Sequence, residues 1–345
     1  MEEKSMKAAM LVGKESIEVR DIGEPSPIGP TEVLVEMDTL SVCLTDFEII
    51  RGQMATKKLP VVLGHEGSGI VISKGIEVTN TAVGDRVLID PNINDLTCPP
   101  CLRGLSNMCE NGGLMGRDAD GVFRERLSLS SRNVYRLPRG IPPAVSTLIQ
   151  PLSTVVHALK RVEIAPGDNI LVVGLGVTGL MLAQMAKLSG AHVIAASGIP
   201  QRLDLALTLG VDAVIDKSEN NLPAAVREAT DGKGVDVLID SIGYRGLMER
   251  EGMEMIKPHG TVLLYATREG TLALDTYAAY KREITFKSTR SSLPQDFEEA
   301  IRLVELNRIN LSYQMSRSFT FSQIYDAISF FEDRVEVLKT VITVN

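Results

Sequence analysis

The pattern of hydrophobic and polar positions changes twice along the chain, first between residues 150 and 167 and again after about residue 292. Before the first change, short apolar segments alternate with Gly and Pro, at 7–12, 32–37, 69–72 and 86–89. Short apolar segments bounded by turn residues are typical of β-strands. The first part of the chain is therefore predicted to form an all-β domain of the barrel or sandwich type.

The second part alternates strands with helices. Residues 169–173 form a continuous apolar run, as a strand buried on both faces requires, and a helical pattern follows at 178–188. Further strands are expected at 191–196, 213–215, 235–239 and 260–265, with a helix at 200–209. Alternating strands and helices predict a parallel, doubly wound sheet, and so an α/β fold for this part.

The last part is predicted to return to the first domain. A helical pattern covers 296–306, and a β-rich tail ends the chain at 339–344. We therefore place the β-rich domain at 1–155, the doubly wound domain at 156–292 and the return segment at 293–345.

Composition excludes several classes of function. Of 345 residues, 44% are hydrophobic and 23% charged, and the net charge of -8 does not favour nucleic acid or anionic membranes as partners. No apolar run reaches the ~20 residues that span a bilayer. The charged start, Met1 to Lys7, lacks the apolar core of a signal peptide. We expect a cytoplasmic protein.

A glycine motif indicates a dinucleotide cofactor. Gly174-Leu175-Gly176-Val177-Thr178-Gly179 directly follows the strand at 169–173 and opens a helix. In that context Gly174 permits a tight turn, Gly176 lets the backbone approach a pyrophosphate, and Gly179 lets helix and strand pack closely. The helix N-terminus adds free N–H groups and a partial positive charge. The alternative is a plain glycine-rich turn, which the flanking strand and helix disfavour.

The end of the second strand bears on the choice between NAD and NADP. An acidic residue there would bind the ribose 2′-OH of NAD, but residues 195–202 contain no carboxylate. Ser197 can donate to a 2′-phosphate and Arg202 can pair with it, which favours NADP over NAD. The alternative is that Arg202 is a solvated residue of the following helix. Tyr265, at the end of a later strand, is expected to approach the nicotinamide.

The cysteines indicate metal binding. Cys98, Cys101 and Cys109 lie within twelve residues, and in an intracellular chain such clustering suggests a metal before disulfides. Cys43 stands apart from this cluster. Its thiol, together with the imidazole and carboxylate of the adjacent His65 and Glu66, belongs to the ligand types that zinc accepts.

Several motifs occur together along the chain. They are Cys43-x-Thr45-Asp46, Gly64-His65-Glu66, Val83-Gly84-Asp85-Arg86-Val87, the cysteine cluster, Pro151-Leu152-Ser153 with His157, and the glycine motif. Taken together, these motifs resemble the zinc-containing medium-chain dehydrogenase/reductase family over essentially the whole chain. Within it, the chain is most similar to the polyol (sorbitol-type) and threonine dehydrogenase branch.

The resemblance implies a GroES-like catalytic domain, a Rossmann-type cofactor domain and a cleft between them. It also implies a homodimer or homotetramer, paired through the cofactor sheets, for which we expect residues 260–265 to supply the edge strand.

The resemblance further implies a catalytic zinc held by Cys43, His65 and Glu66, with water completing the site. Thr45, two residues after the ligand cysteine, would be the first hydroxyl of a proton relay. The family often continues this relay with a histidine at the position of Glu48. Glu48 either relays a proton itself or is a surface carboxylate.

Gln150 departs from the pattern of the branch, which usually has glutamate before Pro-Leu-Ser. An amide oxygen is a poorer zinc ligand and cannot act as a base, but it can hold a water molecule or the substrate by hydrogen bonds. The implied reaction is hydride transfer between NAD(P) and a secondary alcohol, polyol or sugar hydroxyl, with zinc polarising the substrate oxygen.

The family's structural zinc lobe, at about 91–112 here, keeps its spacing but begins with Asp95 where the family has cysteine. A carboxylate is an acceptable zinc ligand. We expect a second zinc held by Asp95, Cys98, Cys101 and Cys109, and so two zinc ions per chain. The alternative is a metal-free lobe with three free thiols.

Two other functions remain open. A zinc-free NADPH-dependent reductase of the same superfamily would lack Cys43, His65 and Glu66, whose presence argues against it. A non-catalytic NADPH-binding protein is suggested by Gln150 and Glu48. Metal content and turnover distinguish the three.

Overall fold

The computed structural model describes residues 5–25, 28–243, 247–266, 271–332 and 337–344, apart from the side chains of 248–250. The chain divides into two compact units. The first comprises Met1–Pro151, Leu293–Leu306 and Leu311–Asn345, and the second comprises Leu152–Ser292 and Asn307–Asn310.

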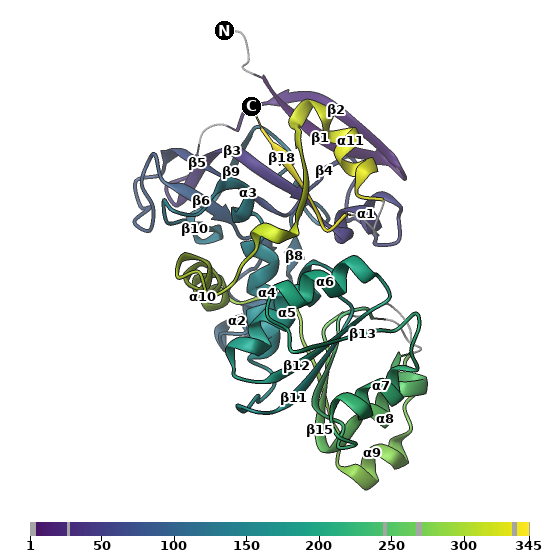
Figure 1. Ribbon diagram of the computed structural model, residues 1–345. Coiled ribbons are helices and arrows are strands. Elements are labelled where there is room, and N and C mark those ends of the chain that lie inside the picture. The colour runs from purple at the N-terminus through teal and green to yellow at the C-terminus, as the bar shows by residue number, and fades with distance from the viewer. Residues whose placement is uncertain (1–4, 26–27, 244–246, 267–270, 333–336, 345) are drawn as a thin grey trace. The chain divides into compact units, whose positions relative to one another are not determined.

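The first unit is built on β-sheets (Figure 1). One sheet has the order β2 (Ser16–Gly23), β1 (Ser5–Gly13), β4 (Val61–Val62). A larger one has the order β10 (Val134–Arg136), β6 (Arg86–Ile89), β5 (Gly67–Lys74), β3 (Glu32–Val42), β18 (Lys339–Thr343), β17 (Met315–Thr320), and β9 (Arg126–Ser130) also pairs with β3. A small hairpin joins β7 (Asn92–Ile93) to β8 (Gly113–Leu114).

Short helices connect these strands. The α-helices are α1 (Leu44–Ile50), α2 (Pro99–Leu102), α3 (Pro143–Ser146), α10 (Pro294–Glu305) and α11 (Ile324–Phe330). The 3-10 turns lie at Ser106–Met108, Ser131–Asn133, Ser312–Gln314 and Phe321–Gln323. Helix α4 (Ile149–Leu159) begins in the first unit and continues into the second.

The core of the first unit follows from alternation in its strands. In β3, Val33, Val35 and Met37 are buried while Glu36 is exposed, because successive side chains of a strand point to opposite faces. The C-terminal strand β18 lies beside β3, with Thr340 opposite Val42 (Figure 1). The end of the chain therefore completes the sheet that begins near its start.

The second unit contains a six-stranded sheet in the order β13 (Ala213–Asp216), β12 (His192–Ser197), β11 (Asn169–Val173), β14 (Val235–Asp240), β15 (Ile256–Leu264), β16 (Thr285–Ser288). All neighbouring strands are parallel. Its helices are α5 (Val177–Leu188), α6 (Pro200–Thr208), α7 (Leu222–Ala229), a π-helical turn at Leu247–Gly252, α8 (Met253–Met255) and α9 (Thr276–Arg282). The predicted doubly wound sheet is confirmed, with the strand order of a Rossmann fold.

The expected edge strand was wrong. Residues 260–265 were predicted to form the edge of this sheet, but β15, which contains most of them, lies between β14 and β16. The segment after α9 adds Thr285–Ser288 as one more parallel strand, with Val262 opposite Phe286. The sheet therefore ends at β16 on this side.

Candidate functional site

Three of the predicted zinc ligands meet in the first unit. The ligand atoms of Cys43, His65 and Glu66 all lie within 4.8 Å of one another. Cys43 is the N-cap of α1, and the other two lie between β4 and β5. The residue before His65 must be glycine. Gly64 has a φ of +89°, and a Cβ added there would lie 2.1 Å from the Phe123 ring.

Asp46 orients the imidazole of His65. Its Oδ1 lies 2.9 Å from His65 Nδ1, and its Oδ2 accepts a hydrogen bond of 2.8 Å from the Cys43 N–H. Burial lowers the pKa of His65, but Asp46 and Cys43 outweigh burial and raise it well above its ordinary value. With Nδ1 engaged by a carboxylate, Nε2 is the nitrogen left for a metal, as is usual for histidine ligands.

Glu66 has one oxygen engaged and one open. Ser41 Oγ donates to Glu66 Oε2, and the Lys339 ammonium forms an ion pair with the same oxygen. Glu66 Oε1 is buried and has no hydrogen-bond partner among the described residues. Because a buried carboxylate oxygen without a partner is costly, this atom fits a bound cation.

Lys339 brings a positive charge into the same cluster. Its side chain is only 3% exposed. Burial lowers its pKa, but Glu66, Cys43 and Asp46 together raise it above its ordinary value. The cluster thus combines a thiol, an imidazole and a carboxylate, the donor types of a zinc site, beside a buried cation.

The predicted catalytic residues occupy two helices. Thr45 and Glu48 lie in α1, directly after Cys43, and both are half-buried. Gln150 lies in the first turn of α4 and is 7% exposed. Their roles stay predictions.

The second predicted metal site is also assembled. Ligand atoms of Asp95, Cys98, Cys101 and Cys109 lie within 4.8 Å of one another. The N–H groups of Asp95 and Glu110 donate to the sulfurs of Cys109 and Cys98, at 3.3 and 3.5 Å.

The charges of this lobe favour a cation. Hydrogen bonds from the Cys98 N–H and from Asn111 and Thr97 hold the pKa of Asp95 well below its ordinary value. Burial and hydrogen bonding with Cys98 and Cys109 raise the pKa of the Cys101 thiol to about 12. Three sulfurs this close become thiolates together only when a cation offsets their charge, so the donor set fits zinc.

The glycine motif forms the turn between β11 and α5 in the second unit. Gly174, Leu175, Gly176, Val177, Thr178 and Gly179 connect β11 to α5. A Cβ at Gly179 would lie 1.8 Å from the Gly174 carbonyl oxygen, whereas one at Gly176, the N-cap of α5, would meet nothing within 4 Å. Tight packing at one glycine and open space at another is what pyrophosphate binding requires.

Two of the other predicted cofactor residues lie at the carboxyl ends of strands, and the third lies in the helix that follows β12. Ser197 ends β12, and its Oγ accepts a 3.1 Å hydrogen bond from the Ile199 N–H. Arg202 lies in α6 and is 5% exposed, with its pKa lowered by burial. Tyr265 follows β15, and its hydroxyl lies 2.7 Å from that of Thr154.

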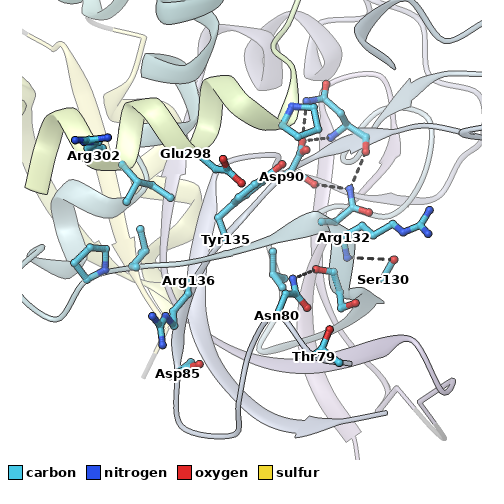
Figure 2. Close-up of a pocket in the computed structure, with 18 of the residues that line it drawn as sticks. Thr79, Asn80, Asp85, Asp90, Ser130, Arg132, Tyr135, Arg136, Glu298 and Arg302 are labelled. Carbon is cyan, nitrogen blue, oxygen red and sulfur yellow. Dashed lines mark hydrogen bonds between the residues drawn. The ribbon is translucent and has the colours of Figure 1, made fainter. Parts of the chain in front are cut away.

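A cavity of about 1570 Å³ lies elsewhere in the first unit (Figure 2). Its wall includes Asp90, Tyr135, Glu298 and Arg302, with Tyr135 stacked on Phe297 at 4.8 Å. Burial raises the pKa of Asp90 to about 7. The described lining includes none of the predicted site residues, so cavity size alone does not identify the reactive groups.

Sequence reasoning missed three residues around the first metal cluster: Ser41, Asp46 and Lys339. Asp46 stood inside a recognised motif without a role. A lysine at the start of an apolar terminal strand was a weak signal for Lys339, and nothing local distinguished Ser41.

Comparison with known protein families gives two matches. Residues 29–139 match the alcohol dehydrogenase GroES-like domain, and residues 177–305 match the zinc-binding dehydrogenase family. Among the described residues, no helix combines the length and apolar character needed to cross a membrane.

Two curated relatives cover most of the chain. L-threonine 3-dehydrogenase of Pyrococcus abyssi is 33% identical over 89% of this chain and 88% of its own length. L-galactonate-5-dehydrogenase of Escherichia coli K12 is 31% identical over 91% of this chain and 92% of its own length.

Two solved structures share the fold with TM-scores of 0.92. One, described as a zinc-binding dehydrogenase from Sinorhizobium meliloti 1021 bound to NADP, is 29% identical and covers 99% of this chain and 100% of its own. The other, described as a short chain alcohol dehydrogenase from E. coli CFT073 complexed with NADH, is 26% identical and covers 99% of each chain.

Proposed function

Because the chain belongs to the zinc-containing medium-chain dehydrogenase/reductase family, we propose that it interconverts a secondary alcohol, polyol or sugar hydroxyl with the corresponding ketone. It is an NAD(P)-dependent oxidoreductase. The observation that carries the proposal is the convergence of Cys43, His65 and Glu66, with ligand atoms within 4.8 Å and one Glu66 oxygen open. Three protein ligands and one open position are typical of a catalytic zinc.

Cys43, His65 and Glu66 would hold the catalytic zinc. Bound zinc supplies Lewis acidity toward the substrate oxygen, and the nicotinamide supplies or accepts the hydride. Asp46 keeps His65 in the orientation that presents Nε2. Thr45 is proposed to pass the substrate proton outward, and Glu48 to continue that relay.

Gln150 is proposed to hold the substrate or its attendant water by hydrogen bonds. Its neutral amide cannot act as a base. It also adds no negative charge near the metal, which leaves the proposed zinc a stronger Lewis acid than a glutamate would.

Asp95, Cys98, Cys101 and Cys109 are proposed to hold a second, structural zinc, which gives two ions per chain. Four protein ligands close such a site, as expected for a structural role. We also propose NADP over NAD, supported by the carboxylate-free turn at 195–202, with Ser197 and Arg202 as the predicted 2′-phosphate ligands and Tyr265 near the nicotinamide.

The substrate is proposed to be a small molecule, and homodimer or homotetramer formation and a cytoplasmic location are carried over from the family resemblance. Domain boundaries at 155/156 and 292/293 likewise stay proposals. The compact units support a catalytic domain that is completed by the segment after 293.

The test is a substrate panel joined to metal analysis. L-threonine, sorbitol, L-galactonate and simple secondary alcohols are assayed with NAD and with NADP, and zinc is counted by mass spectrometry. We expect turnover, two zinc ions per chain, and for Cys43→Ser the loss of one zinc and about a 100-fold or larger fall in kcat, since metal stabilisation is worth several kcal/mol.

Cys101→Ser is the matched control, because it removes a thiol from the other metal cluster. It is expected to lower stability while the ion at Cys43 is retained. Unchanged turnover in Cys43→Ser would exclude the zinc mechanism. NADPH binding without turnover across the panel would favour a non-catalytic binding protein.

A further inference from the structure

Lys217, which sequence reasoning did not single out, lies at the carboxyl end of the cofactor sheet. Strands β12 and β13 pair in parallel, with Ser197 opposite Asp216. Lys217 directly follows β13, and its N–H donates a 3.0 Å hydrogen bond to the Ser197 carbonyl. Lys217 is therefore fixed by its backbone beside the turn that follows β12.

The side chain of Lys217 extends over that turn. A Cβ added at Gly198 would lie 3.6 Å from Lys217 Cε and 3.8 Å from its Cγ. The aliphatic stem thus runs along Gly198, at a distance where an added Cβ would only touch it. The lysine itself is exposed.

The positive charge of Lys217 affects the pKa of Asp240, at the end of another strand of the sheet. Burial raises the pKa of Asp240, at the end of β14, and the N–H groups of Ile242 and Gly243 and the charge of Lys217 oppose that rise. Strand β14 lies beyond β11, the strand that leads into the glycine motif. The positive charge of Lys217 therefore acts along the edge where a dinucleotide binds in this fold.

Arg202 differs from Lys217 in accessibility. It is 5% exposed and burial lowers its pKa, whereas Lys217 is exposed. A side chain whose charge already faces solvent can meet a ligand phosphate without rearrangement. Of these two cations, Lys217 meets that condition.

We infer that Lys217 binds the 2′-phosphate of NADP, above Gly198, and so determines cofactor preference; this inference rests on the proposed NADP-dependent function. In a Rossmann fold the 2′-position of the adenosine ribose lies at the end of the second strand, here β12. An ammonium binds phosphate as a compact point charge. Because Gly198 carries no side chain, the stem of Lys217 and a phosphate have room together.

The carboxylate of Asp216, next to Lys217 in the chain, is expected to repel a 2′-phosphate. Its Oδ1 accepts hydrogen bonds of 2.8 and 2.5 Å from the N–H and hydroxyl of Ser218. The carboxylate is thereby held against the Ser218 turn. Lys217 must offset its negative charge for a 2′-phosphate to bind.

The test uses 2′,5′-ADP and 5′-AMP as probes, since they differ only in the 2′-phosphate. Binding to the full zinc-loaded chain is measured by titration calorimetry for the wild type, Lys217→Met, Lys217→Arg, Arg202→Met and Asp216→Asn. The control is Lys233→Met, which changes an exposed lysine of the same unit. We expect Lys217→Met to lower the affinity for 2′,5′-ADP by about 10- to 100-fold and to change the affinity for 5′-AMP little. This is the loss expected for one charged hydrogen bond. Lys217→Arg should recover most of the affinity, and Lys233→Met should match the wild type.

Several results would overturn the inference. One is unchanged 2′,5′-ADP affinity in Lys217→Met, and another is an equal loss for both probes, which would place Lys217 on the 5′-phosphate side. A selective loss in Arg202→Met alone would assign the role to Arg202. Asp216→Asn is expected to raise the affinity for 2′,5′-ADP. If it lowers the affinity for 5′-AMP instead, Asp216 accepts a hydrogen bond from the ribose 2′-OH and the site binds NAD.

The same titration separates this inference from the proposed function. Wild-type binding of 5′-AMP without any gain for 2′,5′-ADP overturns the role of Lys217 but leaves an NAD-dependent dehydrogenase intact. Binding of neither probe would contradict the dinucleotide site itself.

Discussion

At the residue scale, the first metal cluster depends on how Glu66 is held. Lys339 and Ser41 both engage Oε2, so Oε1 is the atom presented to a cation. A carboxylate held by one oxygen has a defined orientation toward its ligand. Lys339 and Ser41 are thus positioning residues for the proposed zinc site.

Lys339→Met is expected to weaken zinc binding at the Cys43 site by about 10- to 100-fold, the usual cost of losing a group that orients a metal ligand. The measurement is zinc retention against a graded chelator, joined to the visible spectrum of the cobalt-substituted protein. That spectrum should change with the coordination of Glu66.

Two variants control this experiment. Lys339→Arg keeps the charge and should restore most of the zinc affinity, and Lys58→Met removes an exposed lysine of the same unit. Loss of stability in Lys339→Met with unchanged zinc affinity and an unchanged cobalt spectrum would show a structural role only.

Asp90 imposes a pH-dependent cost on folding. Burial raises its pKa from 3.8 to about 7. Between these values the unfolded chain has released the proton while the folded chain keeps it, so stability falls as pH rises through this range. The stability that protonated Asp90 allows is fully present below about pH 4 and is lost above about pH 7. The free energy of unfolding changes by roughly 4 kcal/mol at most over this range.

Asp90→Asn should remove this dependence. Near pH 4 its stability should match the wild type, and near pH 8 it should exceed it by up to roughly 4 kcal/mol, as measured by chemical denaturation at each pH. The exposed Asp204→Asn serves as control and should not alter the slope. Parallel curves for Asp90→Asn and wild type across this range would show that Asp90 ionises normally in the folded protein.

At the element scale, the glycines at the junction of β11 and α5 have different roles. One is needed for packing and another leaves space for a ligand. The chain turns at Gly174, whose φ is +97°, and α5 then packs back so closely that Gly179 lies against the Gly174 carbonyl. Gly176, at the N-cap, meets nothing within 4 Å. Each glycine is therefore required for a different reason.

This difference predicts opposite outcomes for two alanine variants. Gly179→Ala should destabilise the protein by about 1–3 kcal/mol, because its Cβ meets backbone that cannot turn aside. Gly176→Ala should keep wild-type stability but lose nucleotide affinity, since its Cβ occupies the approach of the pyrophosphate. Thermal melting and 5′-AMP titration measure the two effects, and wild-type nucleotide binding by Gly176→Ala would exclude the proposed binding at the glycine motif.

Sheet topology also decides which strand is an edge. The apolar pattern identified residues 260–265 as a strand, and β15 includes most of that range. It did not identify β16, because Thr285–Ser288 contains a single apolar residue, Phe286, and none of its side chains is fully buried. Any pairing of copies through this side of the sheet would involve β16.

At the scale of the whole molecule, the first unit is assembled from three stretches of chain. Strand β18 lies between β3 and β17, and it carries Lys339 to a cluster whose other members come from near the start of the chain. A large share of this cluster's electrostatics thus depends on a segment that is distant in sequence. The second unit is more local, because its strands and helices follow one another along the chain.

By itself, the sequence determined the two kinds of architecture, the glycine motif and the candidate ligand sets. Hydrophobic period, turn residues and short motif spacings report local geometry, which depends on near neighbours in the chain. The ligand atoms of both predicted metal sets do lie together, while the roles of Thr45, Glu48 and Gln150 stay predictions.

Only the tertiary structure decided what surrounds those motifs. The Asp46–His65 pair, the Lys339 and Ser41 contacts to Glu66, the place of Lys217 beside Gly198 and the order of the edge strands all join residues from different elements. Such contacts depend on strand order and register. No period or spacing within one segment encodes these, because they are set by which surfaces pack together when the whole chain folds.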